Sequence, residues 1–73
     1  MNKEEEIIKY AMDLSFKIVD NATDKDGNID MPLLMAGVSL ALDKVFNVIS
    51  KGDKEVYNQL WNIMIGYINV VKD

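Results

Sequence analysis

Residues 3–21 carry the first helical repeat of the chain. Apolar side chains recur every three or four positions, at Ile7, Ala11, Leu14 and Ile18. This spacing places them on one face of an α-helix. Asn2, with Glu5 three residues later, is typical of the capping box that begins a helix. The pattern therefore predicts a helix over residues 3–21.

Residues 31–50 form a second repeat that is apolar around most of a helix. Asp30 suits the N-cap, and Pro32 is tolerated in a first helical turn. The main face combines seven apolar residues with two at its edge, namely Leu34, Val38, Ala41, Leu42, Val45, Val48 and Ile49, with Met35 and Phe46 at the edge. A helix that is apolar on nearly every side has to be covered on nearly every side.

A second apolar patch lies opposite that main face. Leu33 and Leu40 flank Gly37, whose small size allows another helix to approach closely. Two interpretations of this patch are open. Either a copy of the chain covers Leu33, Gly37 and Leu40 in a homodimer, or another helix of the same chain wraps round to cover them.

Residues 54–71 carry the third repeat. Gly52 suits the left-handed residue after a helix, and Asp53 suits the next N-cap. Two apolar stripes run along this segment: Val56, Leu60, Ile63, Tyr67 and Val70, and beside them Tyr57, Trp61, Met64, Ile68 and Val71. We expect Tyr57, Trp61, Met64 and Tyr67 to be core residues, with Ile65 exposed. Three helices with short connections predict an all-α, antiparallel three-helix bundle that forms a single domain over residues 1–73 and self-associates.

The loop at residues 24–30 resembles the start of an EF-hand calcium loop. With Asp24 in position 1, the glycine position is Ile29 and the position of the bidentate glutamate is Met35. The register that places Gly27 correctly loses the first and last ligands instead. A turn that ends in an N-cap is the favoured interpretation, so we predict no metal site; weak binding of a divalent cation is the alternative.

Composition excludes several functions. The chain has a net charge of −4, with no histidine, cysteine or arginine, and all eight cations are lysines. Histidine is the commonest acid–base catalyst, and basic patches drive contact with nucleic acid. We therefore predict no enzymatic activity, no cofactor and no direct nucleic-acid partner. The start of the chain does not resemble a signal peptide and no apolar run has membrane-spanning length, so we expect a cytoplasmic protein without a membrane partner.

Acidic residues gather in the first helix and the first loop. They are Glu4, Glu5, Glu6, Asp13, Asp20, Asp24, Asp26 and Asp30. One interpretation is a solvated surface that keeps an apolar protein soluble. The other is an anionic surface that binds a basic groove on another protein in place of nucleic acid.

In size, helicity, acidity and lack of catalytic residues, the whole chain resembles the small Lys/Asn/Ile-rich proteins with which phages disable host machinery. One such protein inhibits the bacterial DNA sliding clamp, whose channel is basic. The resemblance has no diagnostic motif and assigns no functional residue. It implies a non-enzymatic inhibitor that binds a host replication or transcription protein. A structural or regulatory subunit of a larger assembly and a weak divalent-cation-binding module are the alternatives.

Overall fold

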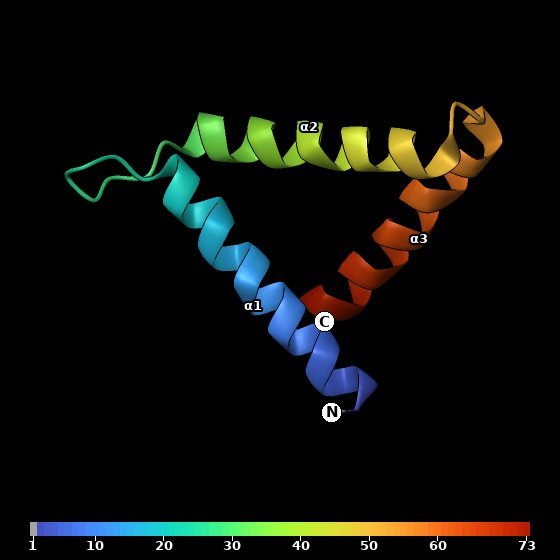
Figure 1. The fold of residues 1–73 in the computed structure, drawn as a ribbon, viewed down its shortest axis with the longest axis horizontal. Helices are drawn as coiled ribbons and strands as arrows, with labels where there is room; N and C mark the ends of the chain where they lie inside the picture. Colours follow the sequence, from blue (N-terminus) through green and yellow to red (C-terminus); the bar gives the residue numbers. More distant parts are fainter. Residues whose placement is uncertain (1) are drawn as a thin grey trace. The chain divides into compact units, whose positions relative to one another are not determined.

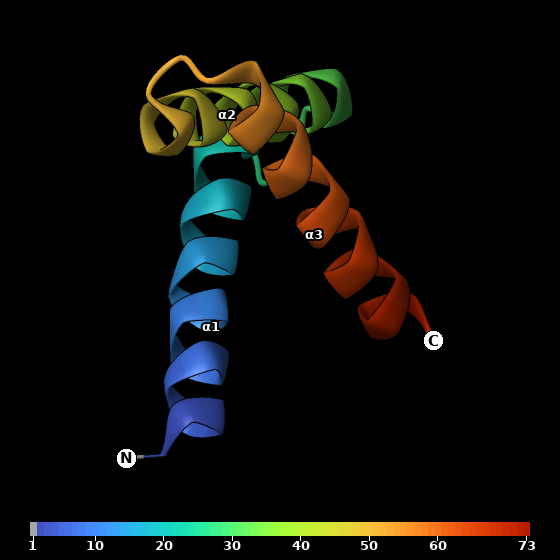
Figure 2. The same cartoon turned by 90° about the vertical axis from the view of Figure 1, so that its right-hand side faces the viewer.

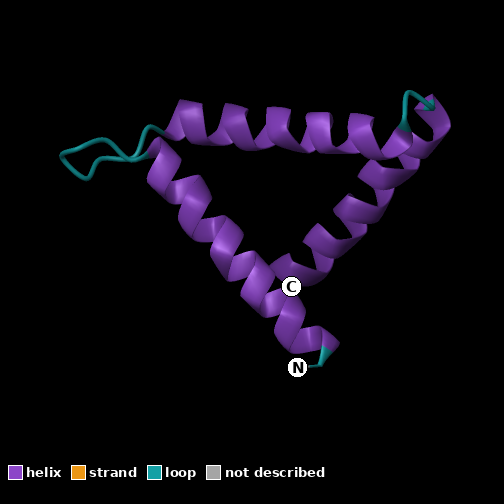
Figure 3. Cartoon of the chain, in the orientation of Figure 1, coloured by secondary structure: helices purple, strands orange, loops and turns teal. Residues whose placement is uncertain are grey.

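The computed structural model describes residues 2–73 and contains three helices, α1 (Lys3–Ala22), α2 (Met31–Ser50) and α3 (Lys54–Lys72) (Figure 1). Each helix ends within one residue of its predicted limit. Everything else in residues 2–73 is loop or turn (Figure 3). The predicted all-α fold of three helices is confirmed, and the contacts between helices are consistent with the predicted three-helix bundle.

Each helix begins at the N-cap residue that the sequence predicts. In every case a side-chain oxygen accepts a backbone N–H group that has no partner inside the helix. The bonds run to Asn2 from Glu5 at 2.9 Å, to Asp30 from Leu33 at 3.0 Å and to Asp53 from Glu55 at 2.9 Å. The starts of the helices are therefore set by local hydrogen bonds.

The chain divides into two compact units, Met1–Ser39 and Leu40–Asp73, here called the first and second unit. The boundary falls inside α2, which both views show as one unbroken helix between its flanking loops (Figure 2). The first unit contains α1 and the start of α2. The second contains the rest of α2 and α3. The single domain predicted from chain length stays a prediction.

In the first unit, the loop between the helices is closed by backbone pairing. Thr23 and Ile29 form an isolated antiparallel bridge, and the Asp30 N–H group donates to the Ala22 carbonyl at 2.9 Å. Ala22, at the end of α1, is 6% exposed and is the buried apolar residue of this unit. The apolar face of α1 toward its N-terminus is exposed, with Ile7 at 59%.

In the second unit, Phe46 is the centre of the packing between α2 and α3. Its side chain is 5% exposed, and its ring meets Trp61 edge-on with centroids 4.9 Å apart and Tyr57 with centroids 6.4 Å apart. The sequence pattern placed Val48 on the main face and Phe46 at its edge, but Val48 is 75% exposed, so that placement was wrong.

The burial of Phe46, and the exposure of Val48, have a geometric cause. Five of the six buried and half-buried residues of α2 recur every four positions, at Leu34, Val38, Leu42, Phe46 and Ser50, and the sixth is Asp43. Four residues turn a helix by about 400°, so such a line shifts by about 40° at each step. A line that begins on the predicted main face at Leu34 therefore reaches the predicted edge by Phe46.

The turn between α2 and α3 uses two left-handed residues. Gly52 has a φ of 85°, as predicted, and Lys51 has a φ of 54°, which the sequence did not indicate. A side chain with a Cβ atom costs about 1–2 kcal/mol in this conformation. Lys51 therefore stores strain at the point where α3 turns back on α2.

Replacing Lys51 with glycine should relieve that strain. Because glycine loses more backbone entropy on folding, we expect Lys51→Gly to raise the free energy of unfolding by only about 0.5–1 kcal/mol. Urea denaturation at one fixed protein concentration measures it. The control is Lys17→Gly inside α1, which should lower the same quantity by about 0.5–1 kcal/mol. Equal losses in both variants would contradict strain at Lys51.

The chain's two phenylalanines give a matched test of where the packing lies. Phe46→Ala removes the most buried aromatic ring and should cost about 3 kcal/mol, while Phe16→Ala removes a ring that is 62% exposed and should cost under about 1 kcal/mol. Thermal and urea unfolding followed by circular dichroism compare the two variants. Similar losses would show that Phe46 is not the centre of packing.

Candidate protein-binding site

Charge is unevenly distributed between the two parts of the chain. Residues 1–30 hold eight acidic residues and four lysines, whereas residues 31–73 hold four of each. The net charge of −4 therefore resides in the first 30 residues. All eight residues of the predicted acidic surface belong to the first unit and are exposed: Glu4, Glu5, Glu6, Asp13 and Asp20 in α1, and Asp24, Asp26 and Asp30 in the loop.

Three of these carboxylates form a line along α1. Glu6, Asp13 and Asp20 recur every seven residues, which places them on one side of the helix about 10 Å apart. Lys9 and Lys17 fall between them on the same side, so the line alternates in sign. Glu6 also lies 4.0 Å from Lys3, an exposed ion pair of the kind that contributes little to stability.

Two of the loop carboxylates have structural roles. One oxygen of Asp24 accepts the N–H groups of Asp26 and Asn28, both at 2.9 Å, and Asp30 caps α2. Gly27 adopts a φ of 85° in the same turn. These bonds support the predicted turn at residues 24–30. Within residues 2–73, no three carboxylates, histidines or cysteines lie close enough together to hold a metal ion.

The predicted self-association patch lies on the surface of α2. Leu33 and Leu40 are 55% and 56% exposed. A Cβ atom built on Gly37 meets nothing within 4 Å. The structure of one chain does not test whether a second copy covers this patch, so self-association stays a prediction.

A hydrogen-bonded cluster in the second unit was not predicted from the sequence. The Tyr57 hydroxyl donates to Asp43 Oδ1 at 2.5 Å, and the Asn47 amide donates to Asp43 Oδ2 at 3.2 Å. Asp43 is half-buried. The hydrogen bond to the Asp43 carboxylate raises the pKa of Tyr57 above its ordinary value of 10.0. Asp43 and Tyr57 are 14 residues apart, so no local pattern announces the pair.

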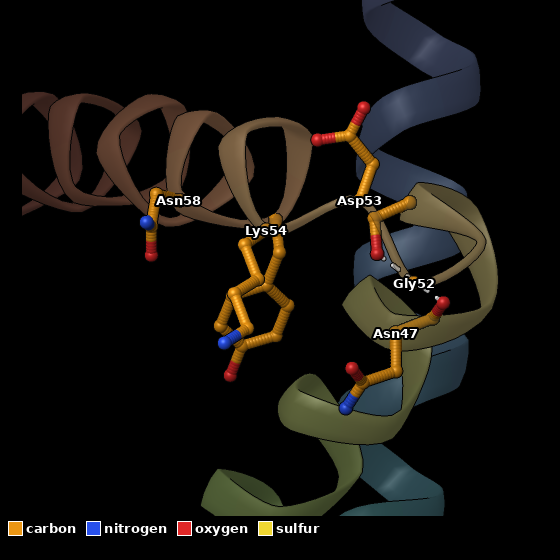
Figure 4. A pocket seen from close by; sticks show the side chains of 7 residues that line it. Asn47, Gly52, Asp53, Lys54 and Asn58 are labelled. Atoms are coloured by element: carbon orange, nitrogen blue, oxygen red, sulfur yellow. Dashed lines mark hydrogen bonds between the residues drawn. The ribbon is translucent and has the colours of Figure 1, made fainter.

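A shallow concavity of about 330 Å³ lies beside this cluster (Figure 4). It is lined by Asn47, Ser50, Gly52, Asp53, Lys54, Tyr57 and Asn58. Several of its polar groups already have partners: the Ser50 hydroxyl donates to the Asn47 carbonyl at 3.3 Å, and Asp53 caps α3. The concavity is therefore a by-product of the turn, and its side chains mainly hold that turn together.

Two aromatic residues of α3 pack against neighbouring side chains, and one lies on the surface. Tyr57 and Trp61 are half-buried and meet edge-on with centroids 6.4 Å apart, as expected of core residues. Tyr67 is 69% exposed, so its assignment to the core was wrong. The contact with α2 reaches α3 near its beginning, and Tyr67 lies two to three turns further along. Ile65 is exposed, as predicted.

By length and composition alone, α2 is the helix within residues 2–73 that is able to cross a membrane. One such helix is weak evidence, because core helices of soluble proteins and signal sequences meet the same criteria; only 11% of the apolar window of α2 is buried. Asp43, Lys44 and Asn47 lie within its second half, and charged groups are costly in hydrocarbon.

Comparison of the chain with known protein families, curated proteins and solved structures found no match. Two surfaces of the chain are suited to contact with another molecule. The first unit presents exposed carboxylates, which steer association with oppositely charged surfaces. The helix α2 presents exposed apolar side chains, which are typical of contact with another macromolecule.

The Tyr57–Asp43 bond is open to a direct pH test. Because the folded-state pKa is raised, the stability that the neutral phenol contributes is complete below pH 10 and is lost as the pH rises through that pKa. The difference between the tyrosinate absorbance titrations of the wild type and Tyr57→Phe isolates the Tyr57 curve. We expect the midpoint of this titration, which is the pKa of Tyr57, to lie above 10. Asp43→Asn should lower this pKa, because it removes the carboxylate. A midpoint at or below 10 would contradict the bond.

Proposed function

We propose that this chain is a non-enzymatic protein-binding protein that attaches its first unit to a basic surface of a larger protein and blocks that surface. The observation that supports this is the location of the whole net charge of −4 within residues 1–30, on exposed side chains. A surface with charge of one sign accelerates association with an oppositely charged protein surface, and it disfavours partners whose surface has the same sign.

The structure divides the acidic residues by their availability. Asp24 and Asp30 hold the loop and the start of α2, so they contribute charge without being free to reorient. Asp13 and Asp20 are exposed on α1, and no hydrogen bond or ion pair within residues 2–73 engages their side chains. We therefore assign the contact chiefly to α1. The interleaved Lys9 and Lys17 give this surface a pattern that a partner can recognise.

Inhibition of a host protein is the form of this function that the resemblance to phage inhibitors implies. A basic channel built to hold nucleic acid, such as that of a DNA sliding clamp, offers the complementary charge. A structural or regulatory subunit is the second candidate, favoured by the exposed apolar side chains of α2. Weak binding of a divalent cation is disfavoured, because Asp24 already accepts two backbone N–H groups.

The test begins with a partner captured from bacterial lysate at low salt, identified by mass spectrometry and purified. Surface plasmon resonance then compares two double variants, Asp13→Lys/Asp20→Lys and Glu55→Lys/Asp73→Lys. Both change the net charge by the same amount, but only the first alters the first unit. We expect the first to slow association about tenfold and the second to change it little.

Ionic strength gives the independent check. Surface charges are screened beyond about 10 Å at 0.1 M salt, so wild-type association should slow steeply as salt increases. Circular dichroism verifies that both double variants keep their helices. Equal effects of the two variants, or binding indifferent to salt, would exclude the acidic docking mechanism. A stoichiometric complex indifferent to salt would instead identify the chain as a subunit.

A further inference from the structure

We draw no further inference here: the strongest candidate, the exposed apolar surface patch of α2 around Leu33, Gly37 and Leu40, carries nothing, because nothing in the structure shows what covers it.

Discussion

The structure depends on α2, which is apolar around most of its circumference and has too few neighbouring helices to cover it. Five of the six residues that α2 buries or half-buries form a single line, from Leu34 through Phe46 to Ser50. The first unit uses the beginning of this line, and the second unit uses its end. One line of contact cannot cover a helix that is apolar on most sides. Much of the apolar surface of α2 is therefore left exposed.

Charge and apolar surface are separated along the chain, and each suits a different kind of contact. The net negative charge lies in residues 1–30, while residues 31–73 are neutral as a whole. Charged groups at a contact chiefly raise the rate of association and its specificity. Buried apolar area supplies most of the affinity. The proposed contact with a basic partner therefore depends on the charged groups of residues 1–30.

The polar clusters of the two loops have a structural function first. Asp24 organises the first loop by accepting two N–H groups, and Asp53 begins α3 in the same manner. The Tyr57–Asp43 bond joins α2 to α3 beside the aromatic packing of Phe46. Groups that are hydrogen-bonded in this way are not available to a ligand. The exposed carboxylates of α1 and the exposed apolar side chains of all three helices remain open to partners.

The sequence alone determined the number, limits and caps of the helices, because periodicity, Asn2, Asp30, Asp53 and Gly52 act within a few residues of the chain. It also located the acidic residues and the exposed patch at Leu33 and Leu40. Only the tertiary structure decided that Phe46, rather than Val48, is buried, that Tyr67 is exposed and that Asp43 accepts the Tyr57 hydroxyl. Those outcomes depend on where α3 meets α2, and on a line of contact that shifts around the helix by about 40° every four residues. No local pattern in the chain encodes that meeting point.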